Sequence, residues 1–122
     1  MTVPAGFVFT LDSIPRAFWS LIRPDGTFAQ AAVLHDYLYW SQTRSRSEAD
    51  EIFKQAMADL GVDTRTAAML YAATRTGGQA AWDENAKRKA SGEKRILKTF
   101  PTDPKVTWDE WRKRPEVFAV AQ

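Results

Sequence analysis

Apolar side chains recur at three- and four-residue intervals along most of residues 1–90, which is the spacing of one face of an α-helix. One such stripe runs through residues 27–41, and two more run through residues 47–60 and 63–76. The widest stripe consists of Phe28, Ala31, Ala32, His35, Leu38 and Tyr39. This pattern predicts a small domain built mainly from helices.

Polar and small residues mark the expected ends of these helices. Ser47 and Asp50 have the spacing of a capping box, and Asp63 stands where it can cap the next helix. Gly77-Gly78 is expected to end that helix, because glycine favours the position just after a helix. Residues 79–90 can then resume as a helix. Each helix is therefore expected to end at a local break in the sequence.

The N-terminal segment has a different pattern. Phe7–Thr10 is short, aromatic and β-branched, and it follows Pro4 and Gly6, which predicts a strand. Ser13, with Pro15 in the first turn, marks the start of a helix. The predicted fold class is therefore mainly α with a short N-terminal strand or hairpin (α+β), as a small helical domain followed by a C-terminal arm.

Residues 91–122 are expected to form that arm, appended to a helical domain of residues 1–90. Residues 100–104 break the chain, and Thr107 with Glu110 predicts a short capped helix. The arm carries large aromatic side chains that need a surface to pack on, either this domain or a partner: Phe100, Trp108, Trp111 and Phe118.

Basic charge is concentrated near the start of this arm. Residues 85–114 hold 10 Lys/Arg and 4 Asp/Glu, although the formal net charge of the chain is only +2. One interpretation is a solvated helix end. The other is contact with nucleic acid or another anionic surface.

The composition excludes several classes of site. The chain has no cysteine, which removes disulfides, thiolate metal sites and cysteine nucleophiles. No apolar run is long enough to cross a bilayer, and the first residues lack the features of a signal peptide. We therefore expect a protein without a membrane partner that stays in the cytosol or is packaged from it.

His35, the single histidine, is the strongest candidate for chemistry. Histidine transfers protons near neutral pH and is a common metal ligand. Because adjacent helical residues point about 100° apart, His35 and Asp36 cannot orient one another as members of a catalytic triad do. They could ligate one metal together, or one could act while the other packs. The alternative is a core histidine with satisfied hydrogen bonds.

Other polar residues could join this pair. Asp12, Ser13 and Arg16 stand at the expected strand-to-helix turn, where an anion could bind. Arg16 could hold a phosphate or carboxylate. Asp50 could reach the site, although capping of its own helix already explains its spacing. An oxygen-rich set of ligands would favour Mg²⁺, Mn²⁺ or Zn²⁺.

Three ordered blocks give the chain a resemblance: Val3–Arg16, Ala31–Tyr39 and Arg46–Phe53. They resemble an uncharacterised family of tailed bacteriophages and prophages with the pattern V-P-x-G-F-x-T-D-x-A-S-I-P-R, A-A-x-x-H-D-x-L-Y and R-x-x-A-D-x-x-F. The resemblance covers about residues 3–82. The family residues that match here are Ser13, Arg16, His35, Asp36 and Asp50. The family's first aspartate is Thr10 in this chain, and Asp12 is the candidate to replace it.

The resemblance implies a phage-encoded protein of the host cytoplasm or the virion. The first hypothesis is a metal-assisted hydrolase with one Zn²⁺, Mn²⁺ or Mg²⁺ ion. Its catalytic residues would be His35, Asp36 and Ser13, its substrate anchor Arg16, and its metal ligands His35, Asp36, Asp12 and Asp50. The second is a virion structural or accessory protein of the neck, tail or capsid that contacts other phage proteins through residues 91–122. The third is a binder of nucleic acid or a host protein through residues 87–114.

Overall fold

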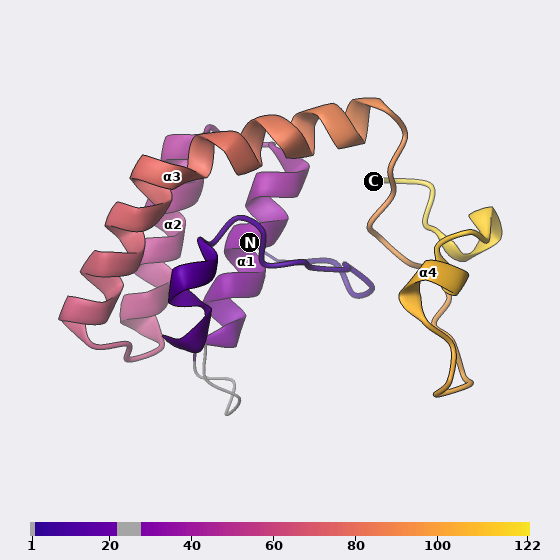
Figure 1. The fold of residues 1–122 in the computed structure, drawn as a ribbon, viewed down its shortest axis with the longest axis horizontal. Helices are drawn as coiled ribbons and strands as arrows, with labels where there is room; N and C mark the ends of the chain where they lie inside the picture. The colour runs from indigo at the N-terminus through magenta and orange to yellow at the C-terminus, as the bar shows by residue number, and fades with distance from the viewer. Residues whose placement is uncertain (1, 22–27) are drawn as a thin grey trace.

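The computed structural model describes residues 2–21 and 28–122, and this part of the chain is mainly helical. Its elements, in order, are η1 (Arg16–Leu21), α1 (Ala29–Ser41), α2 (Arg46–Asp59), α3 (Thr64–Ala90), α4 (Trp108–Trp111) and η2 (Pro115–Val117). Helices α1, α2 and α3 pack pairwise against one another. Figure 1 shows α3 continuing beyond this bundle toward the C-terminal segment. None of the described helices is long and apolar enough to cross a membrane.

Local capping explains where two of the main helices begin. The side chain of Ser45 accepts the N–H of Glu48, and the Glu48 side chain accepts the N–H of Ser45, which completes a capping box. The predicted pair of Ser47 and Asp50 was therefore wrong by two residues, because Asp50 points into the protein. The prediction for Asp63 is confirmed, since it caps α3 by accepting the N–H of Thr66 at 2.9 Å.

Helix α3 runs through Gly77-Gly78 without interruption, so the predicted break there was wrong. Gly78 is buried, and a Cβ atom at this position would collide with the hydroxyl of Tyr39 and crowd Nη1 of Arg46. Gly78 is therefore needed inside the helix, because the side chains of Tyr39 and Arg46 approach the helix backbone closely at this position.

The predicted N-terminal strand was also wrong, and with it the α+β fold class. No strand or sheet forms among residues 2–21 and 28–122, where only isolated bridges occur. Phe7 makes one such antiparallel bridge to Ile96. Gly6 turns the chain with a φ of 93°, and Leu11 turns it again with a φ of 65°. Between these turns the segment is too short and too bent to build a ladder.

The apolar core lies among the three main helices and η1, and a smaller cluster holds the C-terminal segment together. The main cluster contains Ile14, Phe28, Ala31, Ala32, Phe53, Met57, Ala67 and Leu70. In the C-terminal segment, Leu97, Val117 and Phe118 form a separate cluster with Val8 packed against it. The segment therefore touches the N-terminal part of the chain, and its division from residues 1–90 as a separate unit stays a prediction.

The role of Gly78 gives a stability test. Gly78→Ala should lower the free energy of unfolding by about 1–3 kcal/mol, because the new methyl group overpacks the site of Tyr39. Gly77→Ala is the matched control, since its Cβ would meet only Pro15 at 3.8 Å and alanine favours a helix by about 1 kcal/mol. Urea denaturation measures both. Equal effects of the two substitutions would contradict the close-approach explanation.

Candidate functional site

Four of the residues singled out from the sequence meet inside the bundle. His35 and Asp36 lie on α1, Asp50 lies on α2, and Ser13 lies at the end of the N-terminal segment. Each of the four is at most 1% exposed to solvent. Buried polar groups need hydrogen-bond partners, and these four partner one another.

A continuous chain of hydrogen bonds joins the four side chains. Nε2 of His35 lies 2.8 Å from Oδ1 of Asp50, and Nδ1 of His35 lies 3.1 Å from Oγ of Ser13. The Ser13 hydroxyl also lies 3.2 Å from Oδ1 of Asp36, to which it can donate. The backbone N–H of Thr10 donates to the other oxygen of Asp36 at 2.9 Å. Ser13 therefore links the neighbouring His35 and Asp36, whose described contacts include no hydrogen bond between them.

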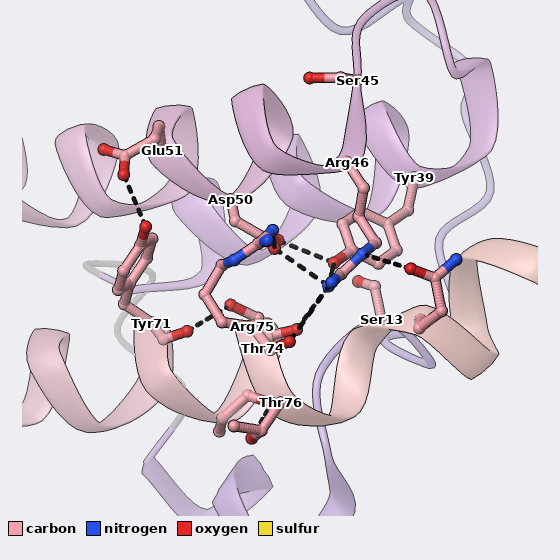
Figure 2. Close-up of polar contacts among 12 residues, drawn as sticks. Ser13, Tyr39, Ser45, Arg46, Asp50, Glu51, Tyr71, Thr74, Arg75 and Thr76 are labelled. Carbon is pink, nitrogen blue, oxygen red and sulfur yellow. Dashed lines mark hydrogen bonds and ion pairs between the residues drawn. The ribbon is translucent and has the colours of Figure 1, made fainter.

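The carboxylate of Asp50 is the most heavily bonded group in this network. Besides its contact with His35, it accepts the hydroxyl of Tyr39 at 2.8 Å, Nη1 of Arg75 at 2.8 Å and Nη1 of Arg46 at 3.3 Å. Figure 2 shows these donors gathered around Asp50 from three helices. Burial raises the pKa of Asp50, but the hydrogen bonds from His35, Tyr39 and Arg75 outweigh burial and hold this pKa below its usual value. The predicted capping role of Asp50 was therefore wrong.

Arg46 fastens this carboxylate to α3. Its Nη1 donates to the carbonyl of Thr74 at 3.0 Å, and its Nη2 donates to the carbonyl of Arg75 at 3.3 Å. Its Nε donates to the side chain of Gln79 at 3.1 Å. These contacts position α2 against the middle of α3, next to Gly78.

Sequence reasoning missed three partners of Asp50. Arg46 had a usable signal, since it precedes Asp50 by four residues and so shares its helix face. Tyr39 follows His35 by the same interval, but this spacing fits the apolar stripe of its helix equally well. Arg75 lies 25 residues from Asp50 in the sequence, and no local pattern identifies it.

The hydrogen-bond geometry indicates which atoms of this network carry the protons. Burial lowers the pKa of His35 most strongly, although the contact with Asp50 opposes this effect. In the neutral ring, Nε2–H donates to Asp50 and leaves Nδ1 as an acceptor for the Ser13 hydroxyl. Ser13 has one proton, so it cannot donate to His35 and Asp36 together. If His35 gains a proton, Nδ1 donates to Ser13, and Ser13 is free to donate to Asp36.

Two other predicted residues lie outside the network. Asp12 is exposed, with its carboxylate 4.0 Å from Nη1 of Arg88. Arg16 stacks its guanidinium over the ring of Trp19 at 5.0 Å, and none of its described contacts joins it to His35 or Asp36. The structure thus places Asp12 and Arg16 on the surface near the turn that carries Ser13.

The network does not fit a metal ion held by the four predicted ligands. Both nitrogens of His35 and both oxygens of Asp50 already bond to protein groups. Asp12 lies apart at the surface. In the described part of the chain, no three residues of the types His, Cys, Asp or Glu form a group that could hold a metal. The arrangement instead supports proton transfer along Ser13, His35 and Asp50.

Acid should destabilise the protein because of His35. Its lowered pKa means that the unfolded chain binds a proton more readily than the folded chain. The contribution of His35 to the free energy of unfolding should therefore be fully present above about pH 6.5. It should fall as the pH drops from there toward the pKa of His35 in the folded state. The slope should approach about 1.4 kcal/mol per pH unit. Urea denaturation at steps between pH 8 and pH 5 measures it.

Because the chain has a single histidine, replacing it removes every histidine titration from the protein. His35→Gln should lower the free energy of unfolding overall and remove its pH dependence above about pH 5. Asp50 adds a loss only at more acidic pH, because its own pKa is lowered. An unchanged slope in the variant, or a gain of stability toward pH 5 in the wild type, would contradict the assignment.

Comparison with known proteins places this network in a family. Residues 1–74 match the family described as "Protein of unknown function (DUF1353)", and that range includes Ser13, His35, Asp36 and Asp50. An uncharacterized protein of Sinorhizobium fredii, y4jT, is 33% identical over 78 residues, which are 62% of this chain and 23% of that protein. This chain thus matches only about a quarter of that relative's length. No solved structure matches. Since the match covers more than half of the sequence, the chain belongs to the DUF1353 family.

Proposed function

We propose that this protein is a hydrolase in which His35 acts as a general base. The observation that carries the proposal is the aligned pair of His35 and Asp50, with the 2.8 Å contact at Nε2 and the opposite nitrogen facing the Ser13 hydroxyl. A base that is oriented by a carboxylate on one side and faces a nucleophile on the other is the arrangement of nucleophilic hydrolases.

The surroundings of His35 suit this role. Burial lowers its pKa, which keeps Nδ1 free to accept a proton at neutral pH. When Nδ1 takes a proton, the adjacent Asp50 carboxylate stabilises the imidazolium. Tyr39, Arg46 and Arg75 keep that carboxylate ionised and fixed in place.

Ser13 determines the course of the reaction. Its Oγ lies 3.1 Å from Nδ1, within reach for proton transfer. Either Ser13 attacks the substrate itself, or it moves aside and water takes its place beside Nδ1. Since Ser13 is only 1% exposed, both courses require the surface turn of residues 10–13 to shift. Thr10 and Asp12 on that turn are exposed, so a shift would uncover the site from this side.

An esterase assay tests the proposal with p-nitrophenyl acetate and p-nitrophenyl butyrate as probes. His35→Gln should lower kcat/KM by about 10²- to 10⁴-fold, because the general base is lost. Glu51→Gln is the matched control, since Glu51 lies on α2 next to Asp50 in the sequence but bonds to the half-buried Tyr71 and not to His35. Circular dichroism establishes that each variant is folded. A folded His35→Gln protein as active as the wild type, or a wild type without activity on either ester, would overturn the proposal.

Ser13→Ala separates the two courses of the reaction. If Ser13 is the nucleophile, this variant loses activity together with the burst of p-nitrophenol that a covalent intermediate produces. If water is the nucleophile, the variant keeps activity and shows no burst.

We propose as a second candidate a structural or accessory protein of a phage particle. The observation that favours it is the exposure of large apolar side chains on the C-terminal segment, where Phe100 is 57% exposed and Trp108 is 39% exposed. Such side chains are typical of surfaces that bind another subunit.

Light scattering coupled to size exclusion tests this second candidate. The wild type should form species larger than the 13.8 kDa monomer, and Phe100→Ser should shift them toward the monomer. Phe9→Ser is the control, because Phe9 is 49% exposed but lies on the N-terminal segment. A monomeric wild type, or an equal shift in both variants, would count against assembly through the C-terminal segment.

A further inference from the structure

A cavity of about 530 Å³ lies between the end of α3, the N-terminal segment and the C-terminal segment. Its lining includes five basic side chains and one acidic side chain, Glu93. The basic ones are Arg88, Lys94, Arg95, Arg112 and Lys113. Its volume is that of a pocket for a small molecule, and its charge favours an anion.

Arg95 is the best-positioned phosphate-binding residue among these basic side chains. It is only 3% exposed, and its guanidinium stacks on the ring of Trp40 at 4.3 Å. Its Nε donates to Glu93 at 2.7 Å, whereas its buried Nη1 has no hydrogen-bond partner among the described residues. A buried guanidinium N–H without a partner is rare in folded proteins, and an anionic oxygen would satisfy it once the guanidinium turns toward the cavity that Arg95 lines.

The backbone holds Arg95 in this position. Its carbonyl accepts the N–H of Val8 at 2.8 Å, and its N–H donates to the side chain of Gln122 at 2.7 Å. Contacts from both ends of the chain therefore fix the arginine before any ligand arrives, which lowers the entropic cost of binding.

The remaining charges indicate a ligand with more than one negative charge. Arg88 forms an ion pair with Glu84 at 3.0 Å, and Arg112 forms one with Asp109 at 3.2 Å. Among the described residues, Lys94 and Lys113 make no ion pair. Several cations around one pocket suit a phosphate dianion better than a single carboxylate.

The aromatic residues of the cavity indicate the rest of the ligand. Trp108 and Phe118 both line it, and their rings meet edge to face with centroids 6.1 Å apart. We propose that this cavity binds a phosphorylated small molecule with a planar ring, of the nucleotide class, with Arg95 as its central phosphate donor. The proposal does not use Ser13, His35, Asp36 or Asp50, none of which lines the cavity, and it shares with the hydrolase mechanism only the turn that carries Thr10.

Isothermal titration calorimetry of the full chain tests this assignment at fixed salt concentration. Adenosine monophosphate should bind, inorganic phosphate should bind at least about tenfold more weakly, and adenosine should bind weakest, because phosphate and ring both contribute. If inorganic phosphate binds as tightly as the nucleotide, the ring has no role and the nucleotide assignment is overturned. Absence of binding by both phosphate compounds overturns the site itself.

Variants locate the binding in the cavity. Lys113→Ala and Arg95→Gln should each weaken nucleotide binding by about tenfold or more. Lys113 is exposed, so its removal tests the site even if Arg95→Gln fails to fold. Lys105→Ala is the matched control, because Lys105 is an exposed lysine of the same segment that does not line the cavity. An equal loss in the Lys105 and Lys113 variants would show nonspecific charge attraction and overturn the assignment.

Discussion

The structure depends on the buried carboxylate of Asp50. A charge removed from water is costly unless ionic and hydrogen-bonding partners surround it, and removing one partner leaves the charge uncompensated. Asp50 meets this requirement with donors from His35, Tyr39, Arg46 and Arg75, which come from all three main helices. The three helices must therefore hold one relative placement for the carboxylate to be satisfied.

This requirement joins stability to the proposed chemistry. The donors that make burial of Asp50 tolerable also hold it where it orients His35. Ser13 continues the chain of contacts to Asp36 and so fastens the N-terminal segment onto α1. Substitutions in the network are for this reason expected to alter folding and activity together, and folding must be measured beside each activity.

The N-terminal segment separates two different environments. On one side the N–H of Thr10 bonds to the buried Asp36, and on the other side Thr10 lines the basic cavity. The C-terminal segment lines that cavity and is held to the N-terminal segment at Leu97, whose N–H donates to the carbonyl of Gly6 at 2.9 Å. The N-terminal and C-terminal segments thus meet beside the helical bundle that contains the buried network (Figure 1).

Local spacing and side-chain chemistry were enough to predict the helical character, the caps at Asp63 and Thr107, and the burial of His35. Contacts between the helices were needed to show that Asp50 joins His35 rather than capping α2, and that Gly78 lies inside a helix. Both outcomes depend on Tyr39, which lies on another helix and which no local pattern brings together with Asp50 or Gly78. Contacts between distant segments override local propensity when a buried charge requires partners.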